Sequence, residues 1–280
     1  QFEQMISSLN TQDAGLYVYS GRSRDVRPVV DANTMMFGDG TNAGLRQVID
    51  ERRQADLGTG SCRMVTSLVG STASLSEDAV GNPFGIKLVA GSVGGAMSNV
   101  VVTGPAGAPS ALNVNFTGQP NSGERISVSV TLPDGKNINL GFAVDTASTS
   151  DDTVFTLGAT PALTAANLKA AIDNRLTSLG QGELRSASAL VAAQQFFAGS
   201  NTNAPQRVAG PPFATSTAYA APGEGRVSRY SPRTKGDAEA ILAAVEALEK
   251  AERPILYTGG GVVNSGPEAS RLLRDLTART

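Results

Sequence analysis

The stretch Ile126–Val144, ISVSVTLPDGKNINLGFAV, decides the fold class of this chain. On both sides of Pro133-Asp134-Gly135, apolar and polar residues alternate with a period of two, which is typical of strands with one buried and one wet face. Proline presets φ at the turn, and glycine accepts a positive φ. The stretch therefore predicts an antiparallel hairpin.

Short apolar or alternating runs precede this hairpin at Ile86–Val89, Val100–Val102 and Leu112–Phe116. Together they predict a small antiparallel β-domain over residues 84–160, and we expect residues 84–157 to fold when expressed alone. Ser, Thr and Asn side chains line the wet face of this domain. That face could bind a sugar, but a solvated sheet surface is the simpler interpretation.

Apolar residues at helical spacing occur on both sides of the β-domain. The predicted elements are a helix at Phe2–Leu9, a short strand at Leu16–Tyr19, a helix over Leu45–Arg52 that closes at Gly58, a helix over Leu163–Leu179 with Thr164 as its N-cap, and a helix over Leu184–Phe197 that ends at Gly199. Residues 204–222 contain four prolines and no helical pattern, which predicts an extended segment.

The amino-acid composition changes after Pro222, where the density of charged side chains roughly doubles. A helix capped by Asp237 is followed by an apolar strand at Ile255–Tyr257, by Gly259-Gly260-Gly261 and by a helix that begins at Pro267. Glycines at the end of a strand can let a ligand approach the backbone near a helix N-terminus, although a plain tight turn is an equally good interpretation.

These patterns predict an α+β protein in which helical segments flank a small antiparallel β-domain and an incomplete α/β tail follows. The expected divisions are residues 1–83, 84–160, 161–222 and 223–280. We also expect the tail to make few contacts with the preceding residues and to be the least stable region. A protease should then cut the Pro-, Gly- and Ala-rich linker Pro211–Gly225 early.

Composition excludes several kinds of site. The chain has no His and one Cys, Cys62, so it cannot hold a His/Cys metal site or a Ser-His or Cys-His nucleophile pair. The formal net charge of −2 argues against nucleic-acid binding. No apolar run approaches the length of about 20 residues that a membrane span needs. No signal peptide is visible, although the chain begins at Gln1 and an upstream segment could be missing.

Seven local strings in residues 1–218 resemble flagellins and flagellar hook-filament junction proteins, in particular their alphaproteobacterial branch. In chain order they are LNTQ (9–12), YVYSGR (17–22), GDGT (38–41), IDER (49–52), ADLG (55–58), GNPFG (81–85) and QRVAGPPF (206–213). The resemblance implies an exported subunit that polymerises through terminal helices, most of which are not encoded here. The scarcity of Cys, Trp and His suits such a subunit.

Residues 226–280 resemble the acetolactate synthase large subunit, at the entry to its central domain. The matching strings are YSP (230–232), KGD (235–237) and RPILYTGGGVVNSGPEAS (253–270). The resemblance implies that Gly259, Gly260 and Gly261 would approach a structural FAD. It also implies that the catalytic and diphosphate-binding domains are missing, so we expect no cofactor and no catalysis. Gly38-Asp39-Gly40 looks like the start of a thiamine-diphosphate motif, but Cys62–Ser67 lacks the required Asn, so we interpret it as a tight turn.

The sequence thus predicts a structural subunit, or a fragment of one, of the bacterial flagellum that acts by self-assembly outside the cell. The alternative is an inactive fragment of a thiamine-diphosphate-dependent acetolactate synthase, which would be cytoplasmic. A sugar-binding β-module ranks last. The expected partners are other filament or junction subunits.

Overall fold

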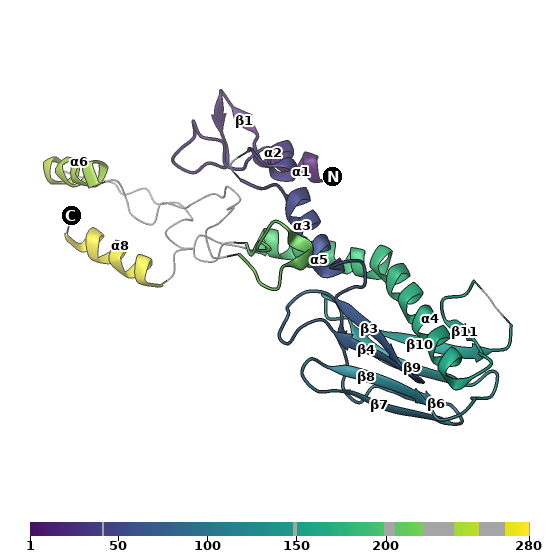
Figure 1. The fold of residues 1–280 in the computed structure, drawn as a ribbon. Helices are drawn as coiled ribbons and strands as arrows, with labels where there is room; N and C mark the ends of the chain where they lie inside the picture. Colours follow the sequence, from purple (N-terminus) through teal and green to yellow (C-terminus); the bar gives the residue numbers. More distant parts are fainter. Residues whose placement is uncertain (41, 148–149, 199–204, 221–237, 252–266, 280) are drawn as a thin grey trace. The chain divides into compact units, whose positions relative to one another are not determined.

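The computed structural model describes residues 1–280 except 41, 148–149, 199–204, 221–237, 252–266 and 280 (Figure 1). The chain divides into two compact units, Gln1–Tyr230 and Ser231–Thr280. The first unit contains helices and antiparallel sheets, so the predicted α+β class is confirmed. The boundary that we expected between residues 222 and 223 lies outside the described residues.

The hairpin predicted from residues 126–144 is present. Strand β9, Arg125–Thr131, pairs antiparallel with β10, Asn137–Asp145, in a register that places Val128 opposite Leu140. These apolar partners are buried, whereas the intervening polar residues face outward. Gly135 closes the turn at a φ of +84°, which explains why glycine occupies this position.

The strands from β3 to β11 form two sheets. The first is antiparallel and contains, in spatial order, β3 Met64–Val69, β4 Thr72–Glu77, β8 Ala111–Phe116 and β7 Val100–Ala106. The second contains β11 Val154–Thr156, β10, β9 and β5 Lys87–Leu88, and β6 Gly94–Ala96 also pairs with β9. Its β10–β11 pair is parallel, which the sequence pattern did not predict.

The predicted start of the β-domain at residue 84 is wrong, because β3 and β4 precede it and make up half of the first sheet. Their backbone pairs extend the ladder directly: Leu75 lies opposite Leu112, and Thr66 lies opposite Leu75. The sequence pattern does not indicate these two strands clearly, because Met64–Glu77 contains a glycine turn and few consecutive apolar residues.

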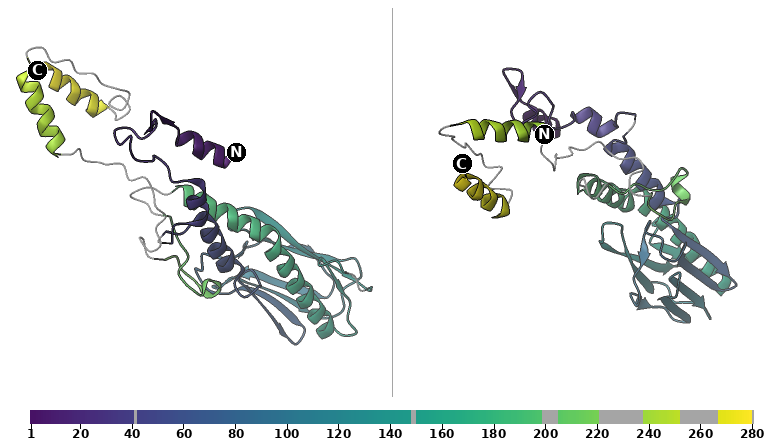
Figure 2. Two further views of the ribbon diagram at one scale, coloured as in Figure 1. Left: turned by 90° about the horizontal axis from the view of Figure 1, so that it is seen from above. Right: turned by 90° about the vertical axis from the view of Figure 1, so that its left-hand side faces the viewer.

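The main hydrophobic core joins both sheets to helix α4, Pro161–Gln181. Leu168, Ile172 and Leu176 from the inner face of α4 are buried with Leu75, Val114, Phe116, Val128, Leu140 and Phe142 from the strands. Figure 2 shows α4 running beside the strands. The helix is therefore part of the β-domain, and the predicted boundary at residue 160 divides a single core.

The N-cap of α4 is Thr160, not the predicted Thr164. Thr160 Oγ1 accepts a hydrogen bond from the backbone N–H of Leu163 at 3.3 Å, and Pro161 occupies the first helical position. Thr164 is buried inside the first turn, where its Oγ1 donates to Gln119 Oε1 at 2.8 Å. One turn of α-helix separates the two threonines, so the apolar pattern alone could not distinguish them.

The remaining helices of the first unit are α1 Phe2–Leu9, α2 Ala32–Phe37, α3 Leu45–Leu57 and α5 Glu183–Ala198. The short strands β1 Gln12–Asp13 and β2 Leu16–Tyr17 form a separate antiparallel pair. Helix α3 ends at Gly58 as predicted, with a φ of +62°. Helix α5 ends where the sequence pattern indicated, although Gly199 lies outside the described residues.

Residues 205–220, which we call the strap, are not the free linker that their prolines predicted. They contain the 3₁₀-helix η1, Phe213–Thr215, and an antiparallel bridge between Val208 and Tyr219. Val208 is buried against Ala55 and Phe84, so the strap packs on the first unit. The part of the expected protease-sensitive linker at Pro211–Ala220 is therefore held by tertiary contacts.

The second unit contains helices α6, Ala238–Lys250, and α8, Pro267–Arg279. The expected strand Ile255–Tyr257 and the glycines Gly259, Gly260 and Gly261 lie outside the described residues, as does the predicted cap Asp237. Several apolar side chains of the two helices are exposed, namely Leu242, Val245, Leu272 and Leu276. The low stability of the tail stays a prediction.

We predict that the excised segment 84–157 fails to form a compact domain, because it lacks β3, β4 and α4. The segment 61–182 should fold, since it contains both sheets and the helix that covers them. Thermal unfolding of the two purified segments, followed by far-UV circular dichroism, tests this. A cooperative transition of 84–157 alone would contradict the observed core.

Candidate functional site: a buried charged cluster on α3

Helix α3 directs charged side chains into the protein interior. Glu51, Arg52 and Asp56 are all less than 5% exposed. Arg52 Nε donates to Asp56 Oδ2 at 2.7 Å across one helical turn. Isolated charges are very costly to bury, so their positions have to be explained by the groups around them.

Glu51 is paired with Arg207, which comes from the strap 156 residues later in the chain. Arg207 Nε donates to Glu51 Oε2 at 2.7 Å, and a second guanidinium nitrogen donates to Oε1, so the pair is bidentate. Gln47 Nε2 donates to Oε1 at 3.0 Å. The carboxylate thus has partners on α3 and on the strap.

Arg52 lies beside two aromatic rings that contact each other. Its guanidinium carbon is 5.3 Å from the ring centroid of Phe84 and 5.9 Å from that of Tyr219. Its Nη1 also donates to the Tyr219 hydroxyl at 2.9 Å. The two rings meet edge to face with centroids 5.1 Å apart. A planar guanidinium can stack and donate at the same time, which a lysine ammonium cannot do.

Arg63 joins three segments. Its Nε donates to the carbonyl of Ala55 on α3 at 2.6 Å, its Nη1 pairs with Asp78 Oδ2 at 3.2 Å, and its Nη2 donates to the carbonyl of Ser216 in the strap. The backbone of Arg63 is left-handed, with a φ of +66°. Gly85 packs against the side chain so closely that a Cβ there would overlap it.

The loop after β4 completes the cluster through hydrogen bonds. The backbone N–H of Gly85 donates to Asp56 Oδ1 at 2.8 Å, and Asn82 Nδ2 donates to Asp78 at 2.9 Å. Among the described residues, every buried side-chain nitrogen and oxygen has a hydrogen-bond partner. We call Glu51, Arg52, Asp56, Arg63 and Arg207, with Phe84 and Tyr219, the α3 cluster. Its charges are paired, so it is suited to holding segments together rather than to catalysis.

Two further groups beside the cluster have shifted pKa values. Burial raises the pKa of the Cys62 thiol to about 12, with the Asp56 charge adding to the effect. The thiol is therefore protonated at neutral pH and is a poor nucleophile. Burial also lowers the pKa of Lys87, although Glu77 and Asp78 act in the opposite direction. Lys87 Nζ donates to the Phe84 carbonyl at 2.9 Å.

The site residues expected from sequence are not in this cluster. Gly259, Gly260 and Gly261 lie outside the described residues. Gly38-Asp39-Gly40 forms the expected turn: Gly38 bridges Ala43, and Asp39 Oδ1 accepts the Asn42 N–H at 2.6 Å. In the part of the chain that the structure describes, no group of three or more His, Cys, Asp or Glu side chains could hold a metal ion.

Sequence reasoning missed the cluster, although four of the quoted strings meet in it: IDER, ADLG, GNPFG and QRVAGPPF. The available signal was the spacing of Arg52 and Asp56 at i,i+4, on the same side of the helix as buried Val48 and Ala55. Arg63 and Tyr219 had no comparable signal, because their role depends on contacts distant in sequence.

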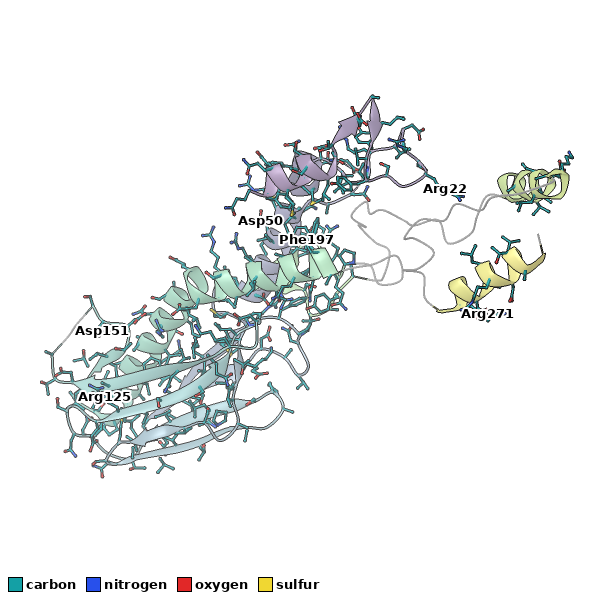
Figure 3. The ribbon with its side chains drawn as sticks, turned by 180° about the vertical axis from the view of Figure 1, so that it is seen from behind. Arg22, Asp50, Arg125, Asp151, Phe197 and Arg271 are labelled. Atoms are coloured by element: carbon teal, nitrogen blue, oxygen red, sulfur yellow. The ribbon has the colours of Figure 1, made fainter. Side chains whose placement is uncertain are left out.

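A second feature is the N-terminal segment, residues 1–37, in which Ile6 is the only buried hydrophobic residue. Six other large apolar side chains of the segment are partly buried, namely Phe2, Tyr17, Val29, Val30, Met35 and Met36. Seven are exposed, namely Met5, Leu9, Leu16, Val18, Tyr19, Val26 and Phe37. Phe2 meets Phe197 at the end of α5, with ring centroids 6.3 Å apart. Phe197 is labelled in Figure 3. Phe197 itself is 53% exposed. This segment therefore presents an apolar surface that the first unit does not cover.

No family model, curated protein or solved structure matches the chain. Within the described residues, no helix is both long enough and apolar enough to span a membrane.

We predict that Glu51→Met destabilises the protein by about 3–5 kcal/mol, because it leaves the buried Arg207 guanidinium without its carboxylate. The double variant Glu51→Met/Arg207→Met should recover much of the loss. Urea unfolding of the single and double variants measures the coupling.

The matched control is Arg53→Met on the same helix. Arg53 pairs with Asp50 at 3.8 Å, and both side chains are substantially exposed, so the change should cost at most about 1 kcal/mol. Equal effects of Glu51→Met and Arg53→Met would show that the buried pair has no special role.

Proposed function

We propose that the chain is a structural subunit of the bacterial flagellum, or a fragment of one, of the flagellin or hook-filament junction type. It acts by packing against like subunits outside the cell and performs no catalysis. The observation that carries this proposal is the N-terminal segment, which exposes at least seven large apolar side chains while burying one. A concentration of exposed apolar side chains in one short segment favours a role in protein–protein contact.

The α3 cluster supports the family resemblance independently of the N-terminal segment. Strings that are up to about 160 residues apart in the chain meet through specific charged and aromatic contacts. The strings that carry the resemblance therefore include residues that shape the first unit. These buried, paired charges also favour a structural role over a chemical one.

The alternative is that the tail defines the protein as an inactive piece of an acetolactate synthase. The exposed Leu242, Val245, Leu272 and Leu276 favour an incomplete α/β fragment in residues 231–280. Such a fragment would remain in the cytoplasm. We rank it second because the resemblance to the synthase covers only residues 226–280, whereas the resemblance to flagellar proteins covers residues 1–218.

We predict that the purified chain self-associates as its concentration rises and that Met5→Asp/Leu9→Asp shifts it toward monomer. Both side chains lie on α1 and are 53% and 37% exposed, so the charges should disrupt the contact without entering the core. Sedimentation velocity over a concentration series measures the association. Val69→Asp, at an exposed position distant in sequence on β3, is the matched control and should associate like the unmodified chain.

The flagellar assignment is tested by co-sedimentation with filaments sheared from an alphaproteobacterium, with filamentous actin as the control. We expect the unmodified chain to pellet with the flagellar filaments and the α1 variant to remain in the supernatant. The proposal would be overturned by a chain that stays monomeric up to its solubility limit and does not pellet with the flagellar filaments.

We also predict that the chain forms no acetolactate from pyruvate, even with saturating thiamine diphosphate, Mg²⁺ and FAD. Activation of the cofactor needs groups from two domains that the resemblance implies are missing. A colorimetric assay for acetolactate, with an intact synthase as the positive control, measures this. Turnover above the buffer background would contradict the structural role.

A further inference from the structure

The strap is closed mainly on itself. The N–H of Ala209 donates to the Ala218 carbonyl at 3.1 Å, and the N–H of Ala220 donates to the Arg207 carbonyl at 2.8 Å. These bonds bring the two ends of the strap together around η1. Compact loops with closed ends can keep their shape through internal contacts. The strap therefore has a conformation that does not depend on continuing a sheet or a helix of the first unit.

The surface beneath the strap is held by contacts that do not involve the strap. Arg52 is fixed by Asp56, Asp56 accepts the Gly85 N–H, and Arg63 is held by Asp78 and by the Ala55 carbonyl. Because these bonds join α3, the residues before β3 and the loop after β4, the surface can keep its shape when the strap is displaced. We call this surface the α3 groove.

The contacts between the strap and the α3 groove are complementary in charge and chemistry. The strap supplies a guanidinium to Glu51, a carbonyl to Arg63 and a phenol to Arg52. Its apolar contribution is Val208 with the partly buried Phe213 and Tyr219, which pack with Ala55 and Phe84 in a cluster separate from the main core. Displacement of the strap would thus break a few specific contacts while leaving the main core intact.

We propose that the α3 groove is a peptide-binding site that its own strap occupies, and that residues 205–220 of a second copy of this chain can occupy it in the same way. The ligand is a closed loop that presents an Arg–Val pair opposite a Tyr. Charge complementarity between Arg207 and Glu51 selects this occupant, and exchange between copies preserves every contact of the strap. The inference concerns a surface other than the N-terminal segment and does not depend on the proposed function.

The test uses the full chain with Arg207→Gln/Tyr219→Ala, which weakens the resident strap, and a fluorescent synthetic peptide of residues 205–220. Fluorescence anisotropy should show saturable binding to this variant and much weaker binding to the unmodified chain, whose groove is occupied. A peptide with Arg207→Gln should bind about tenfold more weakly or worse, because it lacks the charge partner of Glu51. Adding Glu51→Gln to the protein should reduce binding of the unmodified peptide similarly.

Two controls make each outcome decisive. Thr217→Ala changes an exposed strap residue and should bind no more peptide than the unmodified chain. The native Cys62, fully buried, reports on the fold, because a thiol reagent should label it slowly in every folded variant. A folded variant that binds no peptide overturns the proposal. Rapid labelling of Cys62 in Arg207→Gln/Tyr219→Ala would overturn it as well, since the strap would then be an integral part of the fold.

Discussion

The burial of Arg63 is the constraint on which the arrangement around α3 depends. A guanidinium removed from water needs acceptors in several directions, and this one finds them on three segments: the Ala55 carbonyl, the Asp78 carboxylate and the Ser216 carbonyl. The requirement extends to neighbours that make no hydrogen bond to the side chain. Gly85 is needed because a Cβ at this position would collide with Arg63. One buried charge thus positions the end of a helix, a loop and a distant strap.

The first unit departs from ordinary burial in two opposite ways. Around α3 it buries charges, and along residues 1–37 it exposes apolar side chains. The buried charges are acceptable because each is paired and hydrogen-bonded within the chain. The exposed apolar side chains of residues 1–37 are not covered by other residues of the first unit. Contact with a second protein surface is the usual way to remove such side chains from water. The α3 cluster thus provides internal cohesion, and association through the N-terminal segment stays a proposal.

The two units differ in how completely their amphipathic strands and helices bury their apolar side chains. In the first, period-two strands and the 3.6-period helix α4 converge on one apolar interior. In the second, α6 and α8 have clear helical patterns but leave Leu242 and Leu272 more than half exposed. Amphipathic helices gain most of their stability from the surface that covers their apolar face. In the described residues of the second unit, the apolar faces of α6 and α8 therefore stay partly open to solvent.

Several features followed from the sequence alone because they depend on neighbours in the chain. The alternation around Pro133-Asp134-Gly135 predicted the hairpin, and Gly58 predicted the end of α3. The apolar spacing over Leu163–Leu179 predicted a helix, in which Leu168, Ile172 and Leu176 are buried but Leu163 is 52% exposed. The sequence pattern was not sufficient to identify the N-cap of α4, because two threonines lie one helical turn apart. Thr160 and Thr164 are both good caps, and only the burial of Thr164 against Gln119 distinguishes them.

Tertiary structure alone decided the extent of the β-domain and the existence of the α3 cluster. Strands β3 and β4 have weak patterns, and their place is set by cross-strand partners such as Leu112 opposite Leu75. Glu51 and Arg207 each look like ordinary solvated charges when read in their own segments. The free energy of burying either charge depends on its partner 156 residues away, and no local pattern carries that information.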